Sequence, residues 1–178
     1  SNARNHGMRL ARGEFIALLD SDDLWDASKL EKQVAFLRAH ADYGMVLTDV
    51  RRVDGAGKPI DVFRRREVIR ADGDILADLV QNPALVPASI LLRRQVFAQL
   101  GGFDESLLTA EDIEFHLRVA AEFKVGVIDE VLTIAARAND GLSSMATSDS
   151  DYVGVMEHFL RAQQGRLSPA TRRAALFA

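Results

Sequence analysis

The sequence predicts an α/β protein in which helices cover a mixed sheet. Two apolar runs without polar alternation, Phe15–Leu19 and Met45–Thr48, are typical of strands that are buried on both faces. Segments with apolar residues at helical spacing accompany these runs, and Ala110–Phe123 is the clearest of them. With 178 residues, of which 48% are hydrophobic and 27% charged, the chain can form one globular domain with its own core.

Helices and strands are expected to alternate from the start of the chain. Arg4–Arg12 should form a short helix that ends at Gly13, because glycine is common just past a helix C-terminus. The strand Phe15–Leu19 follows, and Ser28 then precedes a helix with Glu31 in its first turn. The apolar residues at helical spacing in that helix are Leu30, Val34 and Leu37.

The second half of the chain continues the α/β pattern. The glycine- and proline-rich stretch Asp54–Pro59 predicts a turn between two short antiparallel strands. Asp74–Val80 is weakly helical, and the stretch "ASILLRR" predicts a strand that runs into a helix over Gln95–Leu100. The remaining expected elements are the helix Ala110–Phe123, strands over Val125–Ile128 and Val131–Ala135, and two helices that begin after Ser148 and after Ser168.

The composition excludes several classes of function. A formal net charge of −4 gives no overall electrostatic footprint for nucleic acid. The absence of cysteine removes disulfides, thiolate metal sites and cysteine nucleophiles. No run of residues is long and apolar enough to span a bilayer, and no signal peptide opens the chain, so we expect a soluble, cytoplasmic protein.

Three segments of different kinds are expected along the chain. Ser1–Ala3 look like the remnant of a cleaved expression tag, so the fold should begin at Arg4. Residues 4–147 should form the α/β domain, and residues 148–178 a helical C-terminal tail.

An acidic cluster follows the first predicted strand. If the strand ends in Asp20-Ser21-Asp22, alternation places Asp20 and Asp22 on one side, at the carboxyl end where α/β sheets bind ligands. Two carboxylates there suit Mg²⁺ or Mn²⁺ held together with substrate phosphate oxygens. The alternative is a solvated turn whose aspartates cap the next helix or bond to the backbone. The cluster by itself does not decide between these readings.

A second acidic pair, Glu111-Asp112, begins the strongest predicted helix. Acids in a first helical turn usually complement the helix dipole, and spacing alone favours that role here. His116 lies one turn after Asp112, as in a common exposed helix pair. The sequence has no histidine pair at metal-ligand spacing, no Gly-x-Ser-x-Gly elbow and no glycine-rich phosphate loop. Nucleophilic triads and Walker-type nucleotide sites therefore have no support.

Two stretches carry a resemblance to a known family. "ARNHGMRLARGEFIALLDSDDLWDASKLEKQ" and "LLRRQVFAQLGGFDESLLTAEDIEFHLRVA" resemble, in order and spacing, two blocks of the family 2 inverting glycosyltransferases. The resemblance covers roughly residues 4–143. It implies a partial GT-A fold, the Rossmann-like fold of nucleotide-diphospho-sugar transferases, with a mixed sheet flanked by helices and a helical C-terminal tail.

The resemblance also implies roles for the two acidic motifs. Asp22 matches a metal ligand, and Asp20 matches a second one that lies nearer the nucleotide sugar. Bound Mg²⁺ or Mn²⁺ would neutralise charge on the departing nucleoside diphosphate. Asp112 matches the catalytic base that takes the proton of the acceptor hydroxyl, and Glu111 would support it.

Further residues are implied to bind the two substrates, a nucleotide-sugar donor, most simply a UDP-sugar, and a carbohydrate or lipid-linked acceptor. Those expected at the donor are Arg4, Asn5, Asp20 and Arg137. Those expected at the acceptor are Gly101, Gly102, Phe103 and Trp25. Trp25 suits stacking on a sugar and packing beneath its loop equally well. Arg64, Arg65 and Arg66, with Arg51, Arg52 and Arg70 nearby, favour a solvated face, and the alternatives are a diphosphate, an anionic acceptor or a peripheral membrane contact at a lipid surface.

Two departures from the family's pattern bear on function. Asn139 stands where many relatives carry a histidine near the metal or diphosphate, which weakens the expected metal affinity. The units that hold the nucleoside base in the family have no counterpart before Arg4, so residues 4–147 would be the C-terminal part of a GT-A domain. We expect such a part to be inactive alone and to self-associate through its open strand edge, most economically as a symmetric dimer.

Two rival functions come from other classes. "FIALLDSDD" followed by "GDILAD", Gly73–Asp78, partly fits a haloacid dehalogenase-type phosphohydrolase, although Asp23 and Leu24 stand where that family has other residues. A noncatalytic interaction module derived from a glycosyltransferase is favoured by Asn139 and by the missing units.

Overall fold

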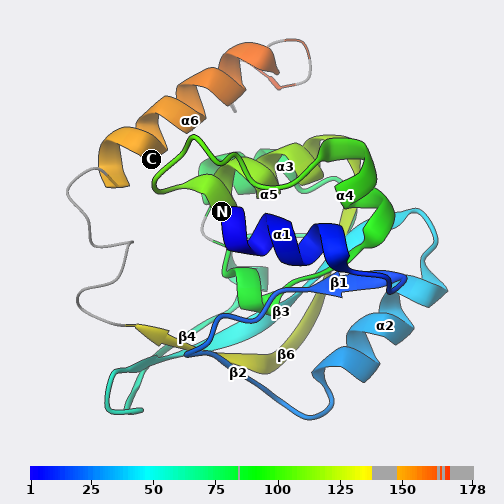
Figure 1. Ribbon diagram of the computed structural model, residues 1–178, viewed down its shortest axis with the longest axis vertical. Coiled ribbons are helices and arrows are strands. Elements are labelled where there is room, and N and C mark those ends of the chain that lie inside the picture. The colour runs from blue at the N-terminus through cyan, green and yellow to red at the C-terminus, as the bar shows by residue number, and fades with distance from the viewer. Residues whose placement is uncertain (84, 138–147, 164, 166, 169–178) are drawn as a thin grey trace.

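The computed structural model describes residues 1–83, 85–137, 148–163, 165 and 167–168 (Figure 1). The helices are α1 (Asn2–Leu10), α2 (Lys29–Ala39), α3 (Leu76–Gln81), α4 (Arg94–Leu100), α5 (Glu111–Glu122) and α6 (Ser148–Ala162). The strands are β1 (Phe15–Ala17), β2 (Leu24–Trp25), β3 (Tyr43–Asp54), β4 (Pro59–Phe63), β5 (Leu91–Arg93) and β6 (Lys124–Arg137). Two short 3₁₀ helices are η1 (Arg65–Glu67) and η2 (Pro87–Ser89). No helix in these described ranges is long and apolar enough to cross a membrane.

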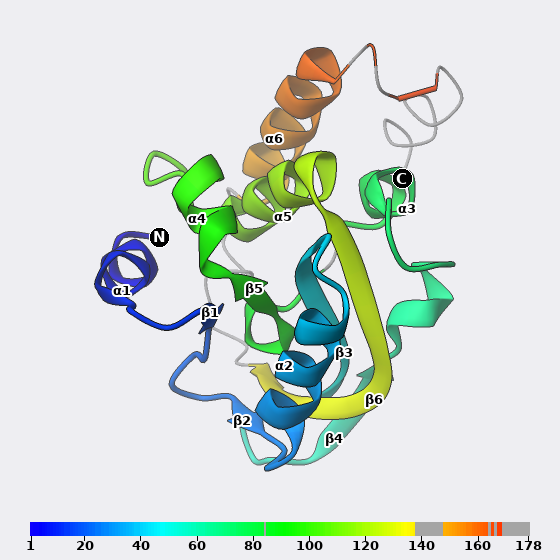
Figure 2. The same ribbon diagram turned by 90° about the vertical axis from the view of Figure 1, so that its right-hand side faces the viewer.

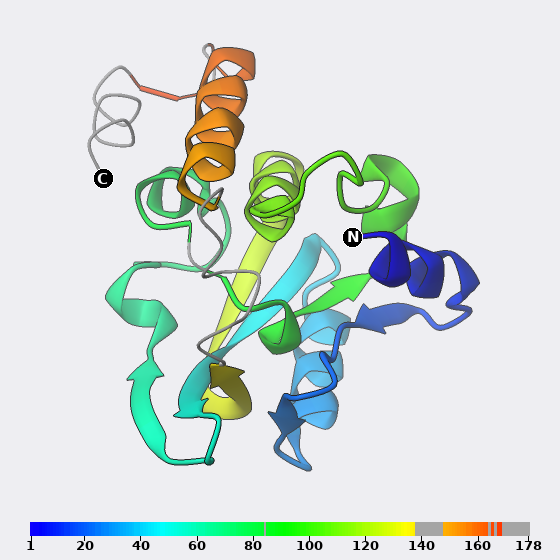
Figure 3. The ribbon, with the colours of Figure 1, turned by 60° about the vertical axis from the view of Figure 1, so that its left-hand side comes forward.

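The strands form one six-stranded mixed sheet, which confirms the predicted fold class. The order is β1-β5-β3-β6-β2, and β4 pairs with β3 beside this path. The central strands β3 and β6 run parallel, whereas the other pairs are antiparallel. Figures 1 and 3 show α2 on one side of the sheet and α3, α5 and α6 on the other.

Burial on both faces explains the apolar run at the start of β3. Met45 and Leu47 belong to the larger core, which also contains residues of α3, α5 and α6. Val46 between them points to the other face and packs with Leu37 of α2 and Leu91 of β5. The sheet is therefore sandwiched between helices, as its lack of polar alternation predicts.

The N-terminal helix differs from its prediction at both ends. It begins at Asn2, inside the tripeptide that was expected to lie outside the fold. It ends before Ala11, whose backbone is extended with φ −64° and ψ 129°. Gly13 therefore lies beyond the end of the helix, and the prediction that it terminates the helix is wrong.

Two strand boundaries also differ. β1 ends at Ala17, so the acidic residues from Asp20 onward lie in a turn instead of at the end of a strand. The strands expected over 125–128 and 131–135 form the single long strand β6, which curves strongly in Figure 2. Its pairing with β3 shifts register near Asp129 and Glu130, and an irregularity of this kind bends a strand.

The buried face of α2 is partly polar. Lys29, Gln33 and Leu37 are buried, whereas Leu30 is 42% exposed. Lys29 donates from Nζ to Gln33 Oε1 at 2.7 Å, and Gln33 donates to the carbonyl oxygens of Val46 and Ser89. Burial lowers the pKa of Lys29 to about 7. Of the expected stripe, Leu37 and Val34 do pack in the smaller core, and the prediction is wrong only for Leu30.

One edge of the sheet is open. β1 pairs with β5 on one side and, within the described residues, with no strand on the other. A groove of about 570 Å³ lies between α1 and β1, and its lining is mainly apolar, including Met8, Phe15, Ile16 and Leu19. An unpaired edge beside an apolar groove is a template for association.

This edge predicts that the chain self-associates. Leu19→Lys should weaken association, because a second chain bound in the groove would remove the charged lysine side chain from water. Light scattering behind size exclusion should report a dimer for the original chain and a monomer for the variant. Leu108→Lys is the control, since Leu108 lies outside the groove and is 62% exposed, against 51% for Leu19. A clean monomer at high micromolar concentration would contradict the prediction.

Candidate active site

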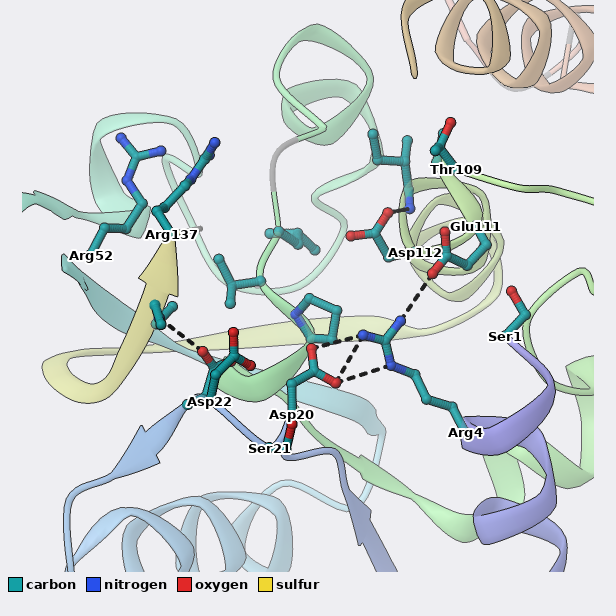
Figure 4. Close-up of a pocket in the computed structure, with 18 of the residues that line it drawn as sticks. Ser1, Arg4, Asp20, Ser21, Asp22, Arg52, Thr109, Glu111, Asp112 and Arg137 are labelled. Atoms are coloured by element: carbon teal, nitrogen blue, oxygen red, sulfur yellow. Dashed lines mark hydrogen bonds and ion pairs between the residues drawn. The ribbon is translucent and has the colours of Figure 1, made fainter. Parts of the chain in front are cut away.

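A cavity of about 880 Å³ brings together most of the charged residues singled out in the sequence. It is bounded by the turn after β1, the start of α1, the start of α5 and the ends of β3 and β6. The predicted site residues that line it are Arg4, Asp20, Asp22, Glu111, Asp112 and Arg137 (Figure 4). These residues come from segments more than 100 positions apart in the chain, from Arg4 to Arg137.

The acidic cluster is a turn that is tied to two neighbouring elements. The N–H of Asp23 donates to the carbonyl oxygen of Asp20 at 3.1 Å, which closes the turn. Asp22 is exposed at the cavity, whereas Asp23 is buried and accepts a hydrogen bond of 3.0 Å from the N–H of Ala136 on β6. Burial raises the pKa of Asp23 to about 6, and the charges of Asp20 and Asp22 add to this shift. The reading of a turn that bonds to the backbone holds for Asp23, whereas Asp22 faces the cavity.

Arg4 connects this turn to the second acidic motif. Its Nη2 donates to Asp20 Oδ1 and Oδ2 at 2.9 and 2.7 Å. Its Nη1 donates to Glu111 Oε1 at 2.9 Å. One guanidinium therefore fixes the distance between the turn after β1 and the start of α5 (Figure 4).

Asp112 is the carboxyl group with the strongest argument for acid–base chemistry. It lines the cavity, and burial, followed by the charge of Glu111, raises its pKa to about 6. Such a group is ionised at neutral pH but accepts a proton more readily than an ordinary aspartate. His116, one turn later, is fully buried instead of exposed, and burial lowers its pKa to about 3. His116 is therefore neutral and adds no compensating charge beside Asp112.

Asn5 is a structural residue in this arrangement. Its Nδ2 donates to the carbonyl oxygen of Phe103 at 2.8 Å and to Glu105 Oε1 at 2.9 Å. Its Oδ1 accepts from the N–H of Phe103 at 2.8 Å. A Cβ added at Gly102 would lie 2.0 Å from that Oδ1, so this loop requires glycine there. The cavity lining includes none of the residues Asn5, Gly101, Gly102 and Phe103. Asn5 ties α1 to the loop that contains the other three residues.

Trp25 also lies outside the cavity lining. Its Nε1 donates to the carbonyl oxygen of Ala88 at 2.7 Å, and the Nζ of Lys29 lies 4.3 Å from the ring centroid. Of the two roles the sequence left open, packing is the one that these contacts favour.

Other predicted features are engaged elsewhere. Asp74 and Asp78 of the dehalogenase-like stretch lie outside the cavity lining and accept hydrogen bonds from the backbone N–H groups of Leu76 and Arg70. Arg65 of the arginine run is buried, and Arg66 pairs with Asp72 and Asp129. Asn139 lies outside the described residues.

The sequence favours a solvated face for Arg52 and gives no role to several other residues that line the cavity. Arg52 joins Arg137 at one end of the cavity, because parallel register pairs Arg52 with Ala135 and Asp54 with Arg137, placing both arginines on one face. Thr109, Ala110 and Tyr152 line the end near α5. No local signal marks these residues, since their position depends on pairing and packing between distant segments.

A metal would have few protein ligands here. Within the described residues, no group of three or more His, Cys, Asp or Glu side chains could hold a metal ion. Asp20 and Asp22 both line the cavity, and Mg²⁺ commonly binds one or two carboxylates together with phosphate oxygens and water. The donor set therefore fits Mg²⁺ or Mn²⁺ if a substrate diphosphate completes the coordination.

Comparison with known proteins identifies the family. The model of "Glycosyltransferase like family 2" matches residues 1–160. The uncharacterized glycosyltransferase MJ1057 of Methanocaldococcus jannaschii is 27% identical over 131 residues, which cover 73% of this chain and 44% of that protein. The poly(ribitol-phosphate) beta-N-acetylglucosaminyltransferase TarS of Staphylococcus aureus is 27% identical over 158 residues, which cover 86% of this chain and 26% of that enzyme.

Solved structures show the same fold. The crystal structure of S. aureus TarS 1-349 matches 98% of this chain and 48% of its own length, with a TM-score of 0.67 and 20% identity. The mannosyltransferase PcManGT from Pyrobaculum calidifontis, in complex with GDP-Man and Mn²⁺, matches 99% of this chain and 48% of its own length, with a TM-score of 0.60 and 21% identity. The fold is that of the GT-A glycosyltransferases, and the chain spans less than half the length of these proteins.

The tie between Asn5 and Phe103 predicts a large loss of stability on mutation. Asn5→Ala leaves the buried N–H and carbonyl of Phe103 unpaired and should lower the free energy of unfolding by about 2–4 kcal/mol. Gly102→Ala should act in the same direction through the clash with Asn5. Gly7→Ala, in the same helix and with no atom within 4 Å of the added Cβ, is the control that should be neutral or stabilising. Urea unfolding measures all three, and an unchanged midpoint for Asn5→Ala would contradict the account.

The raised pKa of Asp112 predicts a pH-dependent stability effect. Because its folded pKa of about 6 exceeds the ordinary value of 3.8, the protonated carboxyl adds stability below about pH 4, and this contribution is lost as pH rises through 6. Asp112→Asn should therefore raise the free energy of unfolding by about 1–3 kcal/mol at neutral pH and leave it unchanged near pH 4. Asp42→Asn should show the opposite sign, since its hydrogen bond with Lys124 lowers the pKa of Asp42. Urea unfolding across pH measures both, and a gain that does not depend on pH would contradict the assignment.

Proposed function

The chain belongs to the glycosyltransferase-like family 2, and from that premise we propose that it transfers a sugar from a nucleotide-diphospho-sugar to an acceptor hydroxyl with inversion. The observation that carries the proposal is the juxtaposition of Asp112 with the Asp20–Asp22 turn across one cavity. Arg4 holds the two sides at a fixed distance through Asp20 and Glu111. A base and an acidic turn that face one bound substrate are what direct displacement at an anomeric carbon requires.

In the proposed reaction, Asp112 accepts the proton of the acceptor hydroxyl as its oxygen attacks the anomeric carbon from the side opposite the leaving group. Glu111, held by Arg4, adds negative charge beside Asp112 and so helps to keep it a good proton acceptor. Asp22 and Asp20 would hold Mg²⁺ or Mn²⁺, which would offset charge on the diphosphate. Arg137, exposed at the other end of the cavity, would bind the donor phosphates.

The relatives support the choice of substrates without fixing them. One structural neighbour is described as bound to GDP-Man and Mn²⁺, and TarS is named for transfer of N-acetylglucosamine to poly(ribitol-phosphate). We therefore propose a nucleotide sugar as donor, with UDP-sugars first and GDP-sugars second, and a glycan or polyol-phosphate hydroxyl as acceptor.

The test compares the two acidic motifs in a polypeptide that contains this chain and extends it at the N-terminal side. Asp112→Asn should lower turnover by about 10²–10⁴-fold with little change in donor KM. Asp22→Asn should instead remove the response to Mn²⁺, and proton NMR of the product should show an inverted anomeric centre. Glu122→Gln, exposed at the far end of α5, is the control for Asp112→Asn, and Ser21→Ala, on the same turn, is the control for Asp22→Asn.

If Asp112→Asn retains nearly all of the original turnover, Asp112 is a helix-capping residue and not the base. Absence of turnover in the extended polypeptide with every nucleotide sugar offered would favour the noncatalytic interaction module.

A further inference from the structure

We propose that Asp151 of α6 is a positioning residue for Asp112, which it orients by clamping the strained backbone that precedes α5. The inference rests on the proposed function, because it concerns the direction of the base in that reaction. It makes α6 part of the catalytic arrangement and not only a covering helix.

The strain lies at Ala110, the residue that precedes Glu111 and Asp112. Its φ of 59° and ψ of 12° are left-handed, and within the described residues Ala110 is the non-glycine residue with positive φ. For an L-residue with a Cβ this conformation costs about 1 kcal/mol or more. It persists only where neighbouring contacts determine the backbone, so the contacts on either side of Ala110 must supply that constraint.

One contact comes from α6. Asp151 Oδ2 accepts from the N–H of Thr109 at 3.1 Å and from its Oγ1 at 2.7 Å. Thr109 is only 6% exposed, so both bonds are shielded from water. A charged acceptor with two donors from one residue fixes the position and the rotation of Thr109 together.

The opposing contact comes from α1. Glu111, on the other side of Ala110, is held by Arg4 at 2.9 Å. Ala110 therefore lies between two residues fixed from different helices, and its backbone angles follow from theirs. Because Asp112 is the second residue after Ala110, rotation of the backbone at Ala110 would swing its carboxylate across the cavity.

α6 is a firm support for this clamp. Its residues Val155, Met156, Phe159 and Leu160 are buried in the larger core, and α6 contacts α5, beside which it lies in Figures 1 and 2. Tyr152, the neighbour of Asp151, lines the same cavity as Thr109 and Asp112. The helix thus anchors the clamp and contributes to the cavity wall.

The experiment separates positioning from simple docking of α6. In the sugar-transferring polypeptide, Asp151→Ala should lower kcat about tenfold or more with donor KM within about twofold, because a small misplacement of a reacting group is costly. Asp151→Asn keeps an oxygen acceptor and should retain kcat within about threefold. Glu157→Ala breaks an exposed ion pair of 3.1 Å on the same helix and should change nothing.

Ala110→Gly provides a second readout. Glycine adopts left-handed angles without strain, so the melting temperature should be unchanged or higher. Because Asp151 and Arg4 still hold the residues on either side, kcat of this single variant should stay within about twofold. Combined with Asp151→Ala, the same substitution should lower kcat further than Asp151→Ala alone, because the clamp no longer sets the angles at position 110. Equal kcat for the double variant and Asp151→Ala would contradict the clamp.

The outcomes are distinguishable from those of the proposed function. A kcat within twofold of the original for Asp151→Ala, or a loss that Asp151→Asn shares in full, would overturn the inference. If the extended polypeptide transfers no sugar, the proposed function fails, and the inference is then decided by the ¹³C chemical shift of the Asp112 carboxyl in this chain. A shift altered by Asp151→Ala and not by Glu157→Ala supports it, and an unaltered shift overturns it.

Discussion

The arrangement of the cavity depends on the ion pairs that Arg4 makes with Asp20 and Glu111. The carboxyl groups of Asp20, Asp22, Asp23, Glu111 and Asp112 all face or border one cavity. Burial raises the pKa values of Asp23 and Asp112, and repulsion from the neighbouring carboxylates adds to this shift. Arg4 offsets this repulsion by pairing with one carboxylate from each side. The positively charged side chain of Arg4 in α1 therefore allows two acidic segments to share a site.

The parts of the fold that could be predicted are those that a continuous pattern of residues marks in the sequence. Met45, Val46 and Leu47 are apolar without alternation because both faces of β3 are covered. The sequence predicts two strands in place of β6, with Asp129 and Glu130 between them. In the structure these two acids pair with Arg66 and Lys32 while the strand continues. A local pattern cannot show that a strand bends without breaking.

The same division applies to the site. The acidic cluster and the Glu111-Asp112 pair could be singled out from the sequence, since each is a short continuous motif, although the cluster lies in a turn and not at the end of β1. The role of Asn5 could not, because its partner Phe103 lies 98 positions away and no property of Asn5 alone distinguishes a ligand from a structural tie. The burial of Lys29 could not be predicted from the polarity of its side chain, for a similar reason. Its Nζ is satisfied by Gln33 and by the ring of Trp25, and only the folded chain brings these groups together.

The parallel pairing of β3 with β6 has a consequence for how the chain folds. Val46 pairs with Gly126, 80 positions later, so the centre of the sheet closes only after a long stretch of chain has been ordered. Contacts of such high sequence separation are entropically expensive and slow to form. During synthesis, the apolar faces of β3 leave the ribosome well before their partner strand exists. The cavity, whose far end is built by Arg52 of β3 and Arg137 of β6, cannot be complete before these two strands pair, and until then the chain exposes apolar residues that favour aggregation.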